Sequence, residues 1–351
     1  MTPVVSVVVV TRNRAADLLR CLGSLQAVRA PALEVLVVDN GSGDGTVERV
    51  RAAHPSVRLL AAPVNRGTSD PRNAAARLSR GRFLWFLDDD AVVADPDLPA
   101  RLAAACEDDP RLGGIGGEAV VDDDGAIVGV KHLRLLPNGL TEGAVFDAPA
   151  GKVAVQCLPS CNLFVPRRVF EEVGGFDDLF FFYLEDLDLT WRIHRRGYRL
   201  EVWARTPVKH CFSERSRRRA RFAPRRSRTV FFVKNMPAWR VLALPLLDLA
   251  YVAAPARLRK LLDRARVHGR GARAAVAATA GAPVTGRGMR EALTEGVWLV
   301  ASLPASWVLA VPHVRAALAS RRRGGGTLRA TDVAAYRRLE PTASGGREVS
   351  R

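Results

Sequence analysis

The sequence has few cysteines, and their pattern argues against a disulfide-stabilised fold. The 351 residues include five, an odd number without a CxxC pair: Cys21, Cys106, Cys157, Cys161 and Cys211. We therefore expect reduced, mostly buried thiols in a cytosolic protein. A zinc site formed by Cys157, Cys161 and Cys211 beside His210 is an alternative, although this spacing matches no common zinc pattern.

Long apolar segments are also missing, which argues against a membrane-spanning protein. The longest uncharged run, Gly296–Val314, is interrupted by Pro304, Pro312 and His313. Its length just reaches across a bilayer, but the interruptions favour packed or interfacial helices. The apolar stretch Val4–Val10 is too short for a signal peptide and follows no basic segment.

Acidic residues are scarce in the back half of the chain. Residues 1–200 hold 23 Lys and Arg against 27 Asp and Glu, so residues 201–351 hold the remaining 30 (53 − 23) against 9 (36 − 27). Such asymmetry indicates an anionic partner for the back half: a membrane surface, a nucleic acid or a phosphorylated substrate. Nucleic acid is disfavoured because no recognition motif is present and few aromatic residues are interleaved with the arginines.

The glycine-rich motifs GxGxxG and GxxxxGK[ST] are absent, so dinucleotide-binding and P-loop folds lose support. Four apolar runs are present, and they are typical of parallel strands covered on both faces by helices: 4–10, 33–39, 57–61 and 82–88. Segments with helical spacing separate these runs, including one over 69–80. The alternation predicts an α/β chain with a doubly wound, Rossmann-like sheet.

Polar clusters follow three of the predicted strands: Thr11-Arg12-Asn13, Asp39-Asn40-Gly41-Ser42 and Asp88-Asp89-Asp90. Ligands of doubly wound sheets bind at the carboxyl ends of the strands, so we expect these clusters to share one site. Three adjacent carboxylates suit Mg²⁺ or Mn²⁺, which prefer oxygen ligands. A solvated turn with an aspartate capping a helix is the alternative.

A second acidic cluster lies in FFYLEDLDLTWRIHRRG, which predicts a helix over 183–197. Asp186 and Asp188 are about 200° apart around such a helix, so they cannot both face one site. Asp188 can pair with Arg192 at i+4. Asp186 lies in the first turn beside aromatic residues, where burial would suit it to general-base work. The alternative is that both are ordinary acids at a helix end.

Strand patterns fill the middle of the chain. Residues 113–165 look β-rich, with a hairpin turn at Asp124-Gly125. His210 ends a later strand-like segment, and the arginine-rich segment 213–229 follows it at once. A lone histidine is more often structural than a ligand, but arginines beside a metal site can hold phosphates. Helical segments continue to about residue 320, and RRRGGG opens a loose tail.

Together these segments resemble the family 2 glycosyltransferases of the GT-A fold, especially bacterial rhamnosyl-type enzymes that extend cell-surface glycans. Six motifs occur in the family's order: SVVVVTRNRAADLLRCLGSL, VVDNGSGDGT, NRGTSDPRNAA, FLDDDAVV, CNLFVPRRVFEEVGGFDDLFFFYLEDLDLTWRIHRRGY and VKHCFS. The resemblance covers roughly residues 4–235. It implies a Rossmann-like nucleotide-binding sheet within a mixed central sheet flanked by helices, and the helical segments that follow predict an α-helical C-terminal extension. Thr68-Ser69-Asp70-Pro71 departs from the family's pattern after Asn65-Arg66-Gly67.

The resemblance also implies a role for each matched residue. Donor binding falls to Thr11, Arg12, Asn13, Asp39, Asn40, Gly41, Arg72, Asn73, Asp88 and Asp89. Asp88, Asp90 and His210 would hold Mg²⁺ or Mn²⁺, with Asp90 as the direct ligand. Asp186 would deprotonate the acceptor hydroxyl in a single displacement with inversion. The implied catalytic domain covers 1–215 (nucleotide-sugar binding 1–90, acceptor side 91–215). The composition of the remaining chain predicts a basic helical region over 216–320 and a flexible tail over 321–351.

The resemblance thus predicts an inverting, metal-dependent glycosyltransferase with a UDP-, dTDP- or GDP-linked donor and a glycan or lipid-linked acceptor. We expect it at the inner face of the cell membrane, because tryptophans among basic helices, such as Trp239, Trp298 and Trp307, suit a membrane interface. A packed helical subdomain with a solvated arginine face is the alternative.

Two other functions are weaker. A sugar-1-phosphate nucleotidyltransferase needs a glycine-rich, basic loop after the first strand, and TRNRAADLL is not one. A non-catalytic protein that binds anions or membranes would leave the acids at the strand ends unexplained.

Overall fold

A computed structural model describes residues 4–29, 33–121, 127–135, 141–146, 151–203, 208–211, 223–253 and 312–339. The first part alternates strands and helices: β1 (Val5–Thr11), α1 (Ala15–Gln26), β2 (Leu33–Asn40), α2 (Thr46–Ala53), β3 (Arg58–Ala62), α3 (Ser69–Leu78) and β4 (Phe83–Asp88). All four expected strands are confirmed, with each end within one residue of its prediction.

Nine strands form one mixed sheet in the order β10-β12-β6-β11-β4-β1-β2-β3-β14. Its further strands are β6 (Leu112–Gly116), β10 (Lys152–Val155), β11 (Asn162–Pro166), β12 (Arg199–Trp203) and β14 (Arg337–Leu339). β4, β1, β2 and β3 are parallel neighbours, which confirms the Rossmann-like half. β11 runs antiparallel between β4 and β6 and makes the sheet mixed.

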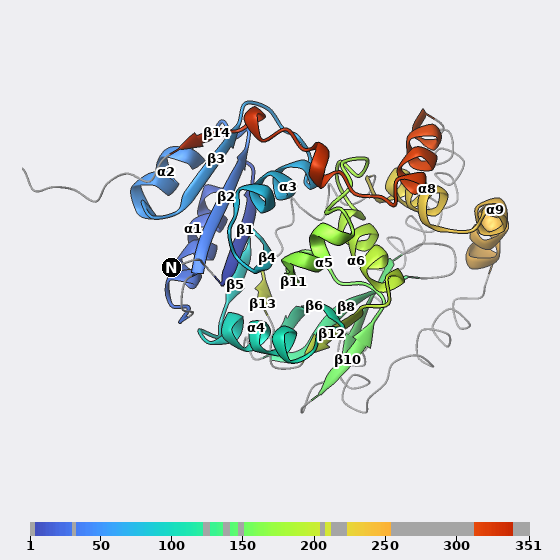
Figure 1. Ribbon diagram of the computed structural model, residues 1–351, viewed down its shortest axis with the longest axis horizontal. Coiled ribbons are helices and arrows are strands. Elements are labelled where there is room, and N and C mark those ends of the chain that lie inside the picture. The colour runs from blue at the N-terminus through green and yellow to red at the C-terminus, as the bar shows by residue number, and fades with distance from the viewer. Residues whose placement is uncertain are drawn as a thin grey trace, which may run out of the picture.

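Helices cover both faces of this sheet (Figure 1). Val8 and Leu36 belong to a core with α3, α5 (Arg167–Glu172) and α6 (Glu185–Arg195). Val7 and Val9 point to the other face and pack with α1, α2 and α4 (Leu98–Asp108). Because successive side chains alternate between two buried faces, the strands read as continuous apolar runs.

A smaller sheet has the order β5-β13-β7-β8-β9, comprising β5 (Ala91–Val93), β7 (Glu118–Val121), β8 (Ile127–Leu135), β9 (Thr141–Phe146) and β13 (Val208–His210). Asp124-Gly125 lies outside the described residues, but β7 and β8 on either side of it pair antiparallel. The expected β-rich segment is therefore confirmed and is divided between the two sheets.

The described back half contains α8 (Ala223–Asn235), α9 (Ala238–Ala253) and a helix over 312–322, all at one end of the molecule (Figure 1). None of the helices in the described ranges is long and apolar enough to cross a membrane. Trp298, Trp307 and most of Gly296–Val314 lie outside these ranges, as does much of the arginine-rich segment 213–229.

The chain then returns to the large sheet through η1 (Leu328–Ala330), η2 (Val333–Ala335) and β14, which pairs antiparallel with β3. The expectation of a flexible tail over 321–351 is therefore wrong for residues 321–339; residues 340–351 lie outside the described part. Leu328 and Tyr336 are buried and anchor this return. Two isolated apolar residues give no periodic signal in a sequence, which is why the pattern missed them.

Candidate active site

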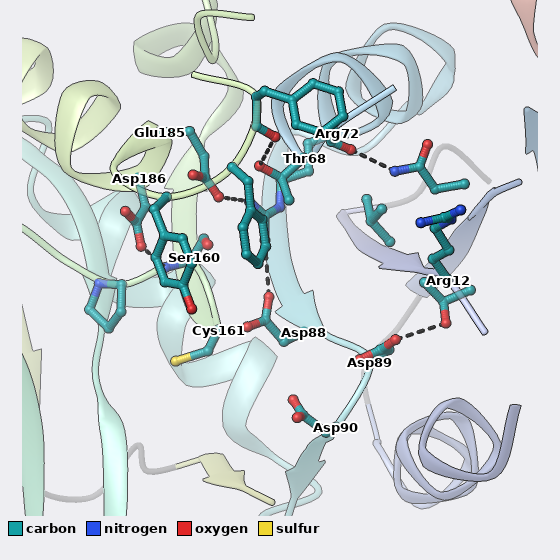
Figure 2. A pocket seen from close by; sticks show the side chains of 18 of the residues that line it. Arg12, Thr68, Arg72, Asp88, Asp89, Asp90, Ser160, Cys161, Glu185 and Asp186 are labelled. Carbon is teal, nitrogen blue, oxygen red and sulfur yellow. Dashed lines mark hydrogen bonds and ion pairs between the residues drawn. The ribbon is translucent and has the colours of Figure 1, made fainter. Parts of the chain in front are cut away.

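A cavity of about 680 Å³ lies at the carboxyl ends of β1, β2 and β4 (Figure 2). This size is typical of small-molecule sites. The predicted site residues on its wall are Thr11, Arg12, Asn40, Arg72, Asp88, Asp89, Asp90, Asp186 and His210. Residues that are far apart in the sequence thus meet at one cavity, as the strand-end rule predicts.

Three residues that were predicted to bind the sugar donor do not line the cavity: Asn13, Asp39 and Gly41. They support the loops behind the cavity wall. The amide of Asn13 donates to Ser42 Oγ at 2.8 Å, and Arg12 Nε donates to the Gly41 carbonyl at 3.4 Å, so the loops after β1 and β2 are joined. Asp39 Oδ2 accepts from the Ser42 amide at 3.1 Å. Asp39 Oδ1 is buried and has no hydrogen-bond partner within the described part of the chain, so it retains the capacity to accept one more hydrogen bond.

Asn73 is fully buried and does not line the cavity. Its Nδ2 donates to the Phe176 carbonyl at 3.0 Å, and its Oδ1 accepts from the Phe176 amide at 3.0 Å. Both the amide nitrogen and the amide oxygen are thereby bonded within the protein. Asn73 therefore supports the position of Phe176, whereas the sequence predicted that it would contact the nucleotide-sugar.

Asp88, Asp90 and His210 each offer one ligand atom, and these atoms lie within 4.8 Å of one another. β13 pairs with β5 so that His210 stands opposite Ala91, and its Nε2 lies 2.9 Å from Asp90 Oδ1. Opposite ligands of Mg²⁺ are about 4.2 Å apart, twice the bond length of about 2.1 Å, which is close to the spread of this set, and the side-chain types suit one small divalent cation.

No other such group occurs among the described residues, and none of the cysteines belongs to this one. The alternative zinc set loses its support accordingly.

The repulsion among the three aspartates is relieved by Arg14, which the sequence analysis did not identify. Its Nη2 lies 2.6 Å from Asp90 Oδ2 and its Nη1 3.3 Å from Asp89 Oδ1. Burial alone would lower the pKa of Arg14, but the two carboxylates outweigh burial and raise it. Burial raises the pKa of Asp89 to about 7, although Arg14 and a hydrogen bond from Thr11 oppose the change.

Asp186 enters the cavity at the start of α6 (Figure 2). The helix begins at Glu185 because Tyr183 and Leu184 both have φ +69°, so the prediction of residue 183 was two residues early. Left-handed backbone at non-glycine residues costs about 1–3 kcal/mol and often accompanies functional sites. Burial raises the pKa of Asp186 to about 7, and the charge of Glu185 adds to the effect. The amide of Ser160 donates to Asp186 at 3.1 Å.

Asp188 points away from the cavity, as its helical phase predicts. It is fully buried and pairs with Arg192 at 2.9 Å, which confirms the expected i+4 contact. It also contacts Lys234 of α8 at 2.7 Å, a partner that the sequence did not reveal.

Arg72 joins the two ends of the site. Its Nη2 lies 2.9 Å from Asp88 Oδ1 and its Nη1 2.7 Å from Glu185 Oε1, as the dashed lines in Figure 2 show. Arg72 and Glu185 are both buried, so a fixed ion-pair chain connects the aspartate cluster with the helix that carries Asp186.

Two further residues on the cavity wall were also missed. Phe181 and Phe182 keep 46% and 41% of their surface exposed, which is unusual for phenylalanine and favours contact with a ligand.

The sequence from residue 6 to 135 matches the family model "Glycosyl transferase family 2". N-acetylglucosaminyl-diphospho-decaprenol L-rhamnosyltransferase of Mycobacterium tuberculosis is 31% identical over 231 residues, covering 56% of this chain and 73% of that enzyme. The O-antigen biosynthesis protein RfbC of Myxococcus xanthus is 30% identical over 237 residues, covering 64% of this chain and 18% of that protein.

Solved structures show the same fold. A mannosyltransferase from Pyrobaculum calidifontis, in complex with GDP-Man and Mn²⁺, has a TM-score of 0.55 at 21% identity and covers 89% of this chain and 88% of its own. GalNAc-T7 with UDP, GalNAc and Mn²⁺ has a TM-score of 0.51 at 17% identity, covering 61% of this chain and 44% of its own. The expected GT-A fold is confirmed. Taken with the family model and the rhamnosyltransferase relative, it establishes that the chain is a glycosyltransferase and belongs to glycosyl transferase family 2.

Proposed function

We propose that this glycosyltransferase moves a sugar, with inversion, from a nucleotide-sugar to a hydroxyl group of a cell-surface glycan or lipid-linked acceptor, with the help of Mg²⁺ or Mn²⁺. One observation carries the proposal. A single cavity holds a cation-type ligand set, Asp88, Asp90 and His210, together with a buried carboxylate of raised pKa, Asp186.

Asp88, Asp90 and His210 would hold the cation, which supplies positive charge to the leaving diphosphate when it is bound. Thr11, Arg12 and Asn40 line the cavity and would bind the nucleotide. The unpartnered Oδ1 of Asp39 would accept an N–H of the base or a ribose hydroxyl. Arg14 pairs with Asp89 and with Oδ2 of Asp90. The other oxygen of Asp90, Oδ1, faces Nε2 of His210.

Asp186 would take the proton of the acceptor hydroxyl. The acceptor oxygen then forms a bond with the anomeric carbon, the bond from that carbon to the phosphate oxygen breaks on the opposite side, and the nucleoside diphosphate leaves. A general base works best when its pKa lies near the working pH, and the pKa of Asp186, about 7, meets this condition.

Phe181 and Phe182 would form the acceptor side. Their exposed rings offer an apolar face for a sugar ring of the acceptor next to Asp186. The Mycobacterium relative acts, by its name, on N-acetylglucosaminyl-diphospho-decaprenol and transfers L-rhamnose. An L-rhamnosyl donor and a polyprenyl-diphosphate acceptor are therefore the first pair to test.

Membrane attachment is the second part of the proposal. Trp239, Leu242 and Leu246 recur at i, i+3 and i+7 on α9 and are 64%, 79% and 70% exposed. A stripe of this kind in a basic region suits the interface of an anionic membrane. We also propose that residues 1–215, completed by 327–339, form the catalytic unit and that the helices of 216–320 present this stripe.

The test combines donor binding with turnover. UDP-, dTDP- and GDP-linked sugars should raise the melting temperature in the presence of Mn²⁺, because a ligand that binds the native state stabilises it. Turnover should release the free nucleoside diphosphate, EDTA should abolish it, and Mg²⁺ or Mn²⁺ should restore it. Asp90→Ala should lose the metal-dependent part of donor binding. Full turnover in excess chelator would remove the cation from the mechanism. Release of a sugar 1-phosphate in place of the nucleoside diphosphate would favour nucleotidyl transfer.

A further inference from the structure

Residues 325–339, here named the strap, pack against α3 and against the loop that carries Asn65 and Gly67 on the cavity wall. The strap leaves the helix over 312–322, passes α3 and ends as β14 beside β3 (Figure 1). None of its residues lines the cavity. Its Tyr336 is nevertheless only 3% exposed, so the contacts of this side chain are shielded from water.

The strap binds α3 along one helical face. Tyr336 Oη donates to Asp70 Oδ2 at 2.8 Å, and Asn73 Nδ2 donates to Thr327 Oγ1 at 3.4 Å. Arg77 of α3 donates to the carbonyl of Thr331. Asp70, Asn73 and Arg77 stand at i, i+3 and i+7, and such positions share one side of a helix.

Tyr336 also supports the loop that precedes α3. Arg66 pairs with Asp70, and its guanidinium lies 5.6 Å from the centre of the Tyr336 ring. The residues on either side of Arg66, Asn65 and Gly67, line the cavity. Tyr336 therefore supports, from outside the cavity, a loop that forms part of the cavity wall.

A second route leads from the strap to Arg72. The amide of Thr327 donates to the Phe176 carbonyl at 2.8 Å, and Thr327 Oγ1 bonds to the same carbonyl at 3.1 Å. The ring of Phe176 lies 5.4 Å from the guanidinium of Arg72, which bridges Asp88 and Glu185. Thr327 thus fixes the packing partner of the arginine that joins the two ends of the site.

We propose that the strap is a positioning element of the donor site, in which Tyr336 and Thr327 set the affinity for the nucleotide without touching it. The physical reason is that a binding wall keeps its geometry only when the residues behind it are themselves locked by packing and hydrogen bonds. This inference rests on the proposed function, because it takes the cavity as the site of the nucleotide-sugar.

The experiment uses the full-length chain and three variants. Tyr336→Phe removes one hydroxyl bond, and Thr327→Val removes the Oγ1 bonds while keeping the shape. Tyr198→Phe is the matched control, since Tyr198 Oη donates to Glu172 at 2.6 Å and does not line the cavity. UDP, dTDP and GDP are titrated with Mn²⁺ by calorimetry, and the nucleotide that the wild type binds is used throughout.

Tyr336→Phe should raise the Kd of that nucleotide about tenfold, which corresponds to roughly 1.4 kcal/mol. Thr327→Val should raise it in the same direction, and Tyr198→Phe should leave it unchanged. The donor KM should rise with the Kd while kcat stays near its wild-type value, a split that a general loss of stability does not produce.

Two outcomes overturn the proposal in different ways. If both strap variants melt at lower temperature but keep the wild-type nucleotide Kd and donor KM, the strap is structural only and this inference fails alone. If the wild type binds none of the three nucleotides, the proposed function fails, and the inference fails with it.

Discussion

The strand β1 and residues 227–235 of the helix α8 are both deeply buried, but by different means. β1 lies between two apolar layers, with Val7, Val8 and Val9 at most 1% exposed. α8 contributes apolar residues as well, but Lys234, 1% exposed on its side chain, contacts Asp177 at 2.6 Å and Asp188 at 2.7 Å. The basic half is thus attached to α6, which carries Asp188, partly by an internal charge cluster.

Part of the positive charge excess of the back half lies in the interior of the protein. A surplus of Lys and Arg suggests a solvated or ligand-binding surface. Lys234 instead neutralises two aspartates of the front half, and Asn235 donates to Asp188 at 2.8 Å. Because a buried charge is tolerated only when it is paired, the two halves depend on each other for stability.

The largest effect is expected on α6, where Asp186 is proposed to accept a proton and Asp188 holds α8 through Lys234. Asp186→Asn keeps the size of the side chain but cannot accept a proton, and loss of a positioned base typically costs about 10²–10⁴ in rate. Donor binding should survive. Asp188→Asn should leave chemistry much less affected and lower stability, because Arg192 and Lys234 lose their partner. Turnover and donor affinity measured on both variants decide the question; the reverse pattern would refute the base assignment.

The charge cluster itself can be broken with Lys234→Met. Removing one partner of a buried ion pair leaves the other charge unpaired, so the free energy of unfolding should fall by about 3–5 kcal/mol. Denaturant unfolding measures this change. Arg51→Met on the exposed surface of α2 is the control and should stay within about 0.5 kcal/mol. Equal stability of both variants would mean that apolar contacts alone hold α8.

The rate should depend on the protonation of Asp186. Its pKa is raised to about 7, so the inactive protonated form dominates below that pH and kcat/KM, which reports the free enzyme, should fall about tenfold per pH unit there. Glu185→Gln removes a charge that raises this pKa, so the inflection should move to lower pH. A pH–rate profile of both proteins tests this, and an inflection that moves upward would contradict it.

The same shift has a consequence for stability. The native state keeps the Asp186 proton between the ordinary pKa of 3.8 and about 7, whereas the unfolded chain loses it. The unfolded state therefore binds fewer protons in this window, and the contribution of Asp186 to stability decreases as pH rises through it. Asp186→Asn should lack this part of the pH dependence of the melting temperature.

The smallest expected effect concerns the exposed stripe of α9. Trp239→Ser with Leu242→Ser should weaken flotation with anionic liposomes several-fold, since partial insertion of apolar side chains is lost. Leu318→Ser, on the helix over 312–322, is the control, because Leu318 is exposed but lies outside the stripe. Salt should weaken binding of the wild type. Unchanged flotation of the double variant would favour the packed helical subdomain.

The sequence by itself determined the strands, the helical phase of Asp188 with Arg192, and the gathering of Thr11, Asn40 and Asp88 at one edge. Each of these follows from a local pattern and one general rule: continuous apolar runs form buried parallel strands, whose carboxyl ends meet. The i+4 spacing of the ion pair is equally local.

The tertiary structure alone decided which distant residues complete the site. His210 reaches Asp90 because β13 pairs with β5, Arg14 turns to the aspartates where α1 begins, and Tyr336 reaches Asp70 after the chain returns to β3. Arginine and tyrosine side chains are long and find partners wherever the backbone places them. Their contacts therefore depend on how far-separated segments pack, and no periodicity in the sequence records that packing.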